Sequence, residues 1–160
     1  MLKITHNEIL APYTAWRIGG PAQYLATVTT ADAFIEAVQW ADERHLPIFV
    51  LGGGSNLLMS DAGFAGLVIR NRAHDYTLEQ HGDSVIVRAA SGTPTAGTAR
   101  KLAAQGIAGM EWAEGLPGTL GGAIFGNAGC YGSDTAHVLK DARLLMPDGR
   151  IETWTNADFK

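Results

Sequence analysis

Cysteine is nearly absent from the sequence, and so is any excess of basic charge. The single Cys130 among 160 residues excludes an internal disulfide, and a chain of this length buries about two thirds of its unfolded surface, so it needs neither a disulfide nor a metal to fold. Twelve Lys and Arg against 16 Asp and Glu give a net charge of -4. A protein that uses nucleic acid as its main partner usually carries the opposite balance.

Long apolar runs are also lacking. Residues 1–10 contain no apolar stretch of signal-peptide length. The longest segment without a charged residue, 115–133, has 19 residues, about enough to span a bilayer, but seven of them are glycine. We therefore expect a cytoplasmic protein with no membrane segment.

The histidines show no spacing typical of metal ligands. They are scattered along the chain, which predicts surface or core positions and no metal site; they are His6, His45, His74, His81 and His137. Glu111 and Glu114 share one turn, and we interpret them as solvated carboxylates rather than an acid and base pair.

Glycine, in contrast, is abundant and clustered. Of 20 glycines, five fall between Gly52 and Gly66 and nine between Gly106 and Gly132. Glycine inside regular elements costs stability. The two clusters therefore predict two places where the backbone adopts positive φ or approaches another group closely.

The remaining sequence alternates strand and helix patterns. A strand over residues 24–28, a helix from about 31 to 44 and a buried strand over 48–51 predict a βαβ-like unit. Further predicted elements are strands at 67–70 and 84–89, a helix at 94–105, and a β-hairpin with strands at 138–145 and 150–155. A change of composition near residues 70–75 suggests a join between subdomains.

The first glycine cluster follows a predicted strand directly. Successive N–H groups in such a turn can bind phosphate oxygens without basic side chains, whereas the alternative is an ordinary tight turn. The named phosphate motifs do not match, because Leu57 stands where a dinucleotide fingerprint needs glycine and no lysine follows a glycine. The residues in question are Gly52, Gly53, Gly54, Ser55, Asn56 and Leu57.

The second cluster places glycines three or four residues apart around a short predicted helix. Such spacing leaves a stripe without side chains, and free N–H groups at the helix start could hold a second phosphate; the alternative is close packing of the helix on a sheet. Two such segments suggest a ligand with a pyrophosphate and an extended organic part, with Cys130 as a small packing residue beside it. The candidate ligand-binding residues here are Gly115, Pro117, Gly118, Thr119, Gly121, Gly122, Asn127, Ala128, Gly129 and Tyr131.

Four segments together resemble a known family. Residues 14–22 (TAWRIGGPA), 51–58 (LGGGSNLL), 115–122 (GLPGTLGG) and 127–132 (NAGCYG) are similar to the UDP-N-acetylenolpyruvoylglucosamine reductases, also called UDP-N-acetylmuramate dehydrogenases. The resemblance implies an α/β FAD-binding fold of the vanillyl-alcohol-oxidase (PCMH) type. It implies a smaller subdomain, residues 1–70, and a larger one, residues 71–160, with noncovalent FAD extended between them.

The same resemblance implies an enzyme of cell-wall (peptidoglycan) synthesis in which NADPH reduces the flavin and the flavin reduces UDP-N-acetylglucosamine-enolpyruvate to UDP-N-acetylmuramate. In this family the catalytic serine, its supporting glutamate and a tyrosine-arginine pair come after a stretch like Asp158-Phe159. We therefore expect no catalytic residue within these 160 residues, a missing C-terminal substrate domain, and an inactive chain. Two alternatives remain, a stand-alone flavin- or nucleotide-binding module and another oxidoreductase of the same FAD-binding fold.

Overall fold

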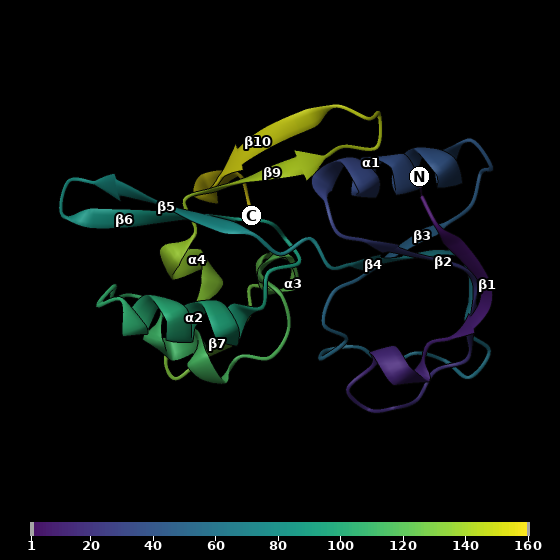
Figure 1. The fold of residues 1–160 in the computed structure, drawn as a ribbon, viewed down its shortest axis with the longest axis horizontal. Coiled ribbons are helices and arrows are strands. Elements are labelled where there is room, and N and C mark those ends of the chain that lie inside the picture. The colour runs from purple at the N-terminus through teal and green to yellow at the C-terminus, as the bar shows by residue number, and fades with distance from the viewer. Residues whose placement is uncertain (1, 160) are drawn as a thin grey trace.

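The chain folds into two lobes that lie side by side (Figure 1). The computed structural model describes residues 2–159. The first lobe contains β1 to β4 and α1, and the second contains the elements from β5 onward.

A four-stranded sheet forms the first lobe. Its strands are β1 (Ile4–Ile9), β2 (Pro21–Val28), β3 (Ile48–Leu51) and β4 (Phe64–Asn71), in the order β1-β2-β4-β3. β1 is antiparallel to β2, while β2 and β3 each run parallel to β4. The predicted βαβ-like unit is present, but β4 lies between its two strands.

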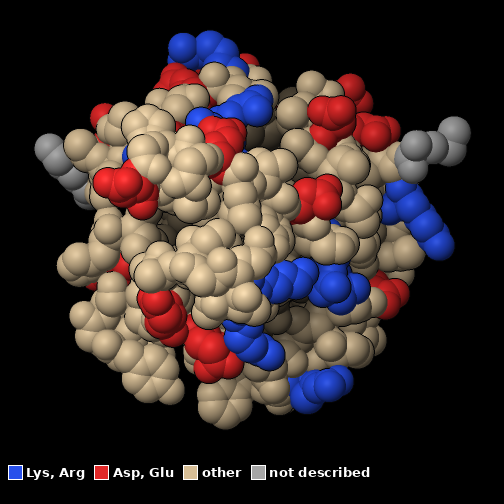
Figure 2. Space-filling model, turned by 60° about the vertical axis from the view of Figure 1, so that its left-hand side comes forward, with Lys and Arg blue, Asp and Glu red and all other residues tan. Residues whose placement is uncertain are grey.

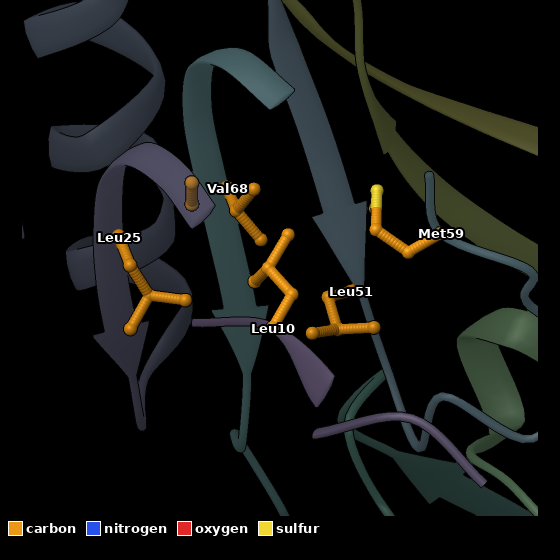
Figure 3. Packing of buried hydrophobic residues seen from close by; sticks show 6 residues of the cluster. Leu10, Leu25, Leu51, Met59 and Val68 are labelled. Carbon is orange, nitrogen blue, oxygen red and sulfur yellow. The ribbon is translucent and has the colours of Figure 1, made fainter. Parts of the chain in front are cut away.

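Both faces of this sheet are covered. Helix α1 (Ala31–Asp42) starts at Thr30, whose Oγ1 accepts a hydrogen bond from the Ala33 N–H at 3.1 Å. Its buried Ala37 and Ala41 pack on one face of the sheet. On the other face lies a cluster of apolar side chains (Figure 3), including Leu10, Leu25, Leu51, Met59 and Val68.

The second lobe consists of small sheets and short helices. The β5-β6 and β9-β10 hairpins both lie above helices α2, α3 and α4 in the view of Figure 1. In chain order the elements are β5 (Tyr76–His81), β6 (Ser84–Ala89), α2 (Thr95–Ala104), η2 (Glu111–Gly115), α3 (Leu120–Phe125), β7 (Gly129–Cys130), β8 (Ser133–Asp134), α4 (Thr135–Val138), β9 (Asp141–Leu145), β10 (Ile151–Thr155) and η3 (Asn156–Asp158). The remaining 3-10 turn, η1 (Ala11–Tyr13), belongs to the first lobe.

Several boundaries differ from the sequence prediction. Residues 135–138 form helix α4, so the predicted strand at 138–145 begins only at Asp141. The reason is Asp134, whose Oδ1 accepts from the His137 N–H at 3.2 Å and caps the turn. Strands β1 and β5 were not predicted, because most of their residues are polar or exposed.

β4 ends at Asn71 and β5 begins at Tyr76, so residues 72–75 join the lobes. We propose a division of the chain into subdomains 1–70 and 71–160, with the boundary one residue before this connection. Within residues 2–159, no helix has both the length and the apolar character that crossing a membrane requires.

Candidate functional site

The glycine loop, residues 52–56, leaves the carboxyl end of β3. Since β3 and β4 are parallel, Arg70 near the end of β4 lies at the same edge of the sheet. Ligands of open α/β sheets bind outside the carboxyl ends of parallel strands. The loop thus occupies the position where this fold presents backbone groups to a ligand.

The two glycine clusters of the sequence meet in space. The Ser55 Oγ donates to the Pro117 carbonyl at 3.2 Å, across 62 positions of sequence. A Cβ added to Gly53 would lie 2.8 Å from the Gly118 Cα, and one added to Gly52 would lie 2.6 Å from the Thr119 Oγ1. Glycine at 52 and 53 is therefore required for the contact between the lobes.

Free donors distinguish the glycine loop from an ordinary turn. Within residues 2–159, the N–H groups of Gly53, Gly54, Ser55 and Asn56 donate to no protein acceptor. Gly54 has φ +67, and its carbonyl accepts from the Ala15 N–H at 2.9 Å. Consecutive unpaired N–H groups in such a turn form an anion site, so the loop fits a phosphate-bearing cofactor.

The start of helix α3 differs from the sequence expectation. Its N–H groups are not free, because Leu120 donates to the Thr93 carbonyl at 2.9 Å and Gly121 donates to the Ser91 carbonyl at 2.8 Å. The Gly122 N–H is 3.4 Å from the Thr119 Oγ1, which caps the helix. In the described chain, Gly118 and Thr119 keep N–H groups without a protein acceptor.

Gly122 is the most open glycine of helix α3. It is exposed, and a Cβ added there would be no closer than 3.5 Å to the Thr119 Oγ1. Gly121 differs, because its added Cβ would lie 2.8 Å from the Ser91 Cβ. Packing explains the glycine at 121 and not the one at 122.

Two aromatic side chains stand exposed in the same lobe. Phe125 at the end of α3 is 96% exposed and Tyr131 is 82% exposed. A Cβ on Gly115 would lie 3.2 Å from the Tyr131 ring, so this glycine leaves room for the tyrosine. Large exposed rings at an open site are suited to contact with a flat ligand or another surface.

Most of the other predicted site residues form hydrogen bonds or packing contacts within the protein. The Asn127 Oδ1 accepts from the Ala136 N–H at 2.9 Å, and the Ala128 carbonyl accepts from the Thr135 Oγ1 at 2.8 Å, which holds α4. Gly129 pairs with Asp134 between β7 and β8. Leu57 packs against the apolar cluster of the first lobe, while Asn56 is exposed.

A hollow of about 290 Å³ adjoins the glycine loop and was not predicted from the sequence. Arg17, Arg70 and Arg72 line it together with Gly52 and Gly53. Its only signal in the sequence is Arg17, which lies in the family-like segment 14–22. The face drawn in Figure 2 carries both acidic and basic side chains, in keeping with the net charge of -4.

Tyr13 lies at the rim of this hollow. Its hydroxyl donates to the Glu8 Oε1 at 2.8 Å, and the Arg70 guanidinium lies 4.6 Å from its ring centroid. The hydrogen bond to Glu8 raises the pKa of Tyr13, burial adds to this, and Arg70 acts in the opposite direction. The tyrosine therefore stays neutral and keeps its ring against the arginine.

An α/β fold whose parallel strand leads into N–H groups without an acceptor among residues 2–159 is typical of domains that bind a nucleotide cofactor. The family model described as FAD binding domain matches residues 22–155. The chain belongs to this FAD-binding family, and the predicted fold class is confirmed.

Similarity to particular proteins is more specific. The chain is 51% identical over 148 residues to the UDP-N-acetylenolpyruvoylglucosamine reductase of Chloroflexus aggregans, covering 92% of this chain and 50% of that protein. For the reductase of Rubrobacter xylanophilus the identity is 43% over 145 residues, covering 91% and 48%. The chain thus spans about half the length of these relatives, and the resemblance seen in the sequence is confirmed.

Solved structures agree. The UDP-N-acetylenolpyruvylglucosamine reductase of Thermus caldophilus matches with a TM-score of 0.77 and 29% identity, over 99% of this chain and 53% of that one. Cholesterol oxidase from Brevibacterium sterolicum has a TM-score of 0.72 at 13% identity, over 96% of this chain and 33% of that one. The second similarity shows the fold alone.

Proposed function

We propose that the chain is the FAD-binding part of an NADPH-dependent reductase that converts UDP-N-acetylglucosamine-enolpyruvate to UDP-N-acetylmuramate in peptidoglycan synthesis. The observation that carries this proposal is the glycine loop at the contact between the lobes, where four N–H groups have no acceptor in the described part of the chain. The 51% identity to the UDP-N-acetylenolpyruvoylglucosamine reductase of Chloroflexus aggregans supports this choice of activity. We propose the cytoplasm as the compartment, in keeping with a single cysteine.

The residues of this chain would bind and orient the cofactor. The N–H groups of Gly53 to Asn56 would hold phosphate oxygens, and the open backbone at Gly122 would allow close approach of the ligand. When bound, FAD supplies the hydride chemistry between NADPH and the substrate. Cys130 is half-buried, and we propose noncovalent binding.

Asn127, Ala128, Gly129 and Tyr131 would shape the second side of the site. The first two fix α4 through their hydrogen bonds, and Tyr131 is exposed beside Gly115. No proton donor to the substrate is assigned to this chain. We place the substrate chemistry in the part of the relatives that the chain does not match.

Gly122→Ala tests the site without disturbing the free protein, because the new Cβ meets only ordinary contacts. We expect FAD affinity, measured by equilibrium dialysis, to fall at least ~10-fold, or about 1.4 kcal/mol. Flavin bound to the unmodified protein should be released completely by acid precipitation.

Gly97→Ala is the matched control, since Gly97 is also a helical glycine, in α2, whose added Cβ would lie 3.6 Å from Pro94. It should leave FAD affinity unchanged and raise helix stability by about 0.5–1 kcal/mol. A folded wild-type protein that binds no FAD would refute the proposed function. If Gly122→Ala, Gly97→Ala and the wild type bind FAD with equal affinity, Gly122 does not contact the cofactor.

A further inference from the structure

Three arginines share one hollow and have no acidic partner among residues 2–159. Within residues 2–159, Arg44, Arg88, Arg100 and Arg150 each form an ion pair with Asp or Glu. Arg17, Arg70, Arg72 and Arg143 form none, and the first three line the hollow beside the glycine loop. This grouping is notable in a chain with a net charge of -4.

The backbone around Arg17 is held in place by its own loop. Arg17 has φ +57, a left-handed conformation that costs a residue with a side chain of order 1 kcal/mol. Thr14, only 3% exposed, stabilises the turn because its Oγ1 donates to the Ile18 carbonyl at 2.9 Å. The Arg17 N–H donates to the Thr14 carbonyl at 3.2 Å.

Arg70 and Arg72 are fixed by the end of the sheet. Arg70 is half-buried, pairs with Thr27 and Leu51 in the neighbouring strands, and stacks over Tyr13. The Arg72 N–H donates to the Val28 carbonyl at 2.7 Å, which ties the start of the connection to β2. Three guanidinium groups therefore come from three positions whose backbones are restrained.

The carboxylate that bonds Tyr13, at the rim of the hollow, is already engaged. Glu8 accepts the Tyr13 hydroxyl at 2.8 Å and forms no ion pair with the three arginines within residues 2–159. Neighbouring positive charges repel one another, and an anion bound between them offsets this repulsion. Guanidinium groups bind phosphate oxygens in bidentate geometry.

We propose that Arg17, Arg70 and Arg72 form a cationic subsite that binds the pyrophosphate of the dinucleotide held by the glycine loop. The loop supplies neutral N–H donors on one side, and the arginines supply the compensating charge on the other. This inference rests on the proposed function for the identity of the dinucleotide. It assigns a role to residues 14–18, which lie outside the range that the family model matches.

Arg17→Gln and Arg72→Gln are the test variants, because both side chains are exposed and their removal leaves the core unchanged. Arg143→Gln is the matched control, an exposed arginine without an ion pair in β9, away from the hollow. FAD affinity is measured by flavin fluorescence at low ionic strength and at ~0.15 M. Thermal unfolding of each variant verifies the fold.

We expect each test variant to lose about 10-fold in FAD affinity at low ionic strength, and less at ~0.15 M, where screening weakens the wild type as well. Lysine at the same positions should restore part of the loss. Riboflavin, which has no phosphate, should bind wild type and variants alike. If Arg17→Gln and Arg72→Gln bind FAD as tightly as the wild type and Arg143→Gln do at both ionic strengths, the subsite is overturned. The proposed function would remain intact.

Titration with inorganic pyrophosphate separates the two proposals. If the wild type binds no FAD, the proposed function fails, and the subsite is then judged on pyrophosphate alone. Weak pyrophosphate binding that disappears in Arg17→Gln and Arg72→Gln supports it. Pyrophosphate binding that is absent from the wild type, or unchanged in the variants, overturns it.

Discussion

Some glycines of this chain are required by tight packing and others leave room for a ligand, and the sequence alone does not distinguish the two. A glycine cluster predicts either ligand approach or tight packing, and both occur here. Gly53 and Gly121 are required by neighbouring atoms of the protein, whereas Gly122 has room for a Cβ. The distinction depends on contacts such as that between Ser55 and Pro117, which are 62 positions apart and leave no local signal.

Gly53→Ala should therefore weaken the contact between the lobes as well as flavin binding. The added Cβ would lie 2.8 Å from the Gly118 backbone, which cannot rotate away as a side chain would. We expect a loss of about 1–3 kcal/mol in the free energy of unfolding, measured with urea. Gly149→Ala, at φ +82 in open space, should cost about 1 kcal/mol and leave FAD affinity unchanged. A Gly53→Ala protein as stable as the wild type would contradict the packing role.

Two buried threonines of α2 provide a second residue-scale prediction. Among the described residues, the Thr95 Oγ1 is buried without a hydrogen-bond partner, whereas the Thr98 Oγ1 donates to the Pro94 carbonyl at 2.8 Å. Thr95→Val should raise the free energy of unfolding by about 1 kcal/mol, because it removes an unsatisfied buried hydroxyl. Thr98→Val should lower it by about 1 kcal/mol. Urea unfolding of the two variants gives the comparison, and equal effects would show that the Thr95 hydroxyl has a partner.

Among the helices and strands, the sequence predicted those whose apolar residues recur at a regular spacing or form a continuous stretch. β3 was found because its apolar residues are continuous, and α1 because its apolar residues recur with helical spacing. β1, with the sequence ITHNEI, has a mixed pattern, and its pairing with β2 stabilises it. The short α4 depends on one capping carboxylate that local propensity does not reveal.

That cap makes α4 sensitive to acid. The hydrogen bond from the His137 side chain, together with that from the His137 N–H, lowers the pKa of Asp134 below its usual 3.8. A carboxyl group with a lowered pKa in the folded state stabilises the fold above its unfolded pKa, and this contribution is lost as the pH falls through the folded pKa. In Asp134→Asn the amide oxygen should still cap the helix. The free energy of unfolding of this variant should fall less steeply at acid pH than that of the wild type. Urea unfolding at a series of pH values measures the difference.

The carboxyl groups of Asp148 and Asp158 also have lowered pKa values, from hydrogen bonds with Arg150 and Thr155 respectively. Their acid dependence should remain in Asp134→Asn. Parallel curves for the variant and the wild type would mean that the Asp134 carboxylate contributes nothing to stability.

At the scale of the whole molecule, the candidate site lies where the two lobes meet. A ligand held by residues 52–56 and 118–122 contacts both lobes and should stabilise both together. FAD at ~100 times its dissociation constant should raise the melting temperature by roughly 5–10 °C. Hydrogen exchange should slow in peptides from β1 to β4 and from α2 to α4, and protection confined to one lobe would contradict a shared site.

The proposed activity predicts that cofactor binding and substrate protonation belong to different halves of the relatives' sequences. The chain matches 50% of the Chloroflexus aggregans reductase, and we expect the groups that protonate the substrate in the other half. A polypeptide of these 160 residues, loaded with FAD, should show no enolpyruvyl-dependent NADPH oxidation under anaerobic conditions. Loss of a general acid alone reduces the rate by ~10²–10⁴. Substrate-dependent turnover at an ordinary enzymatic rate would place those groups within residues 1–160.

The central position of β4 determines when the first lobe can form during synthesis. β2 and β3 each pair with β4 and not with one another, although both precede it in the chain. The parallel part of the sheet therefore cannot form until residues 64–71 have left the ribosome. Until then, the apolar side chains of β2 and α1 that pack against β4 stay uncovered. Non-local parallel pairing of this kind is slow. A chaperone that binds nascent apolar segments should therefore be released from this chain only after Asn71 emerges.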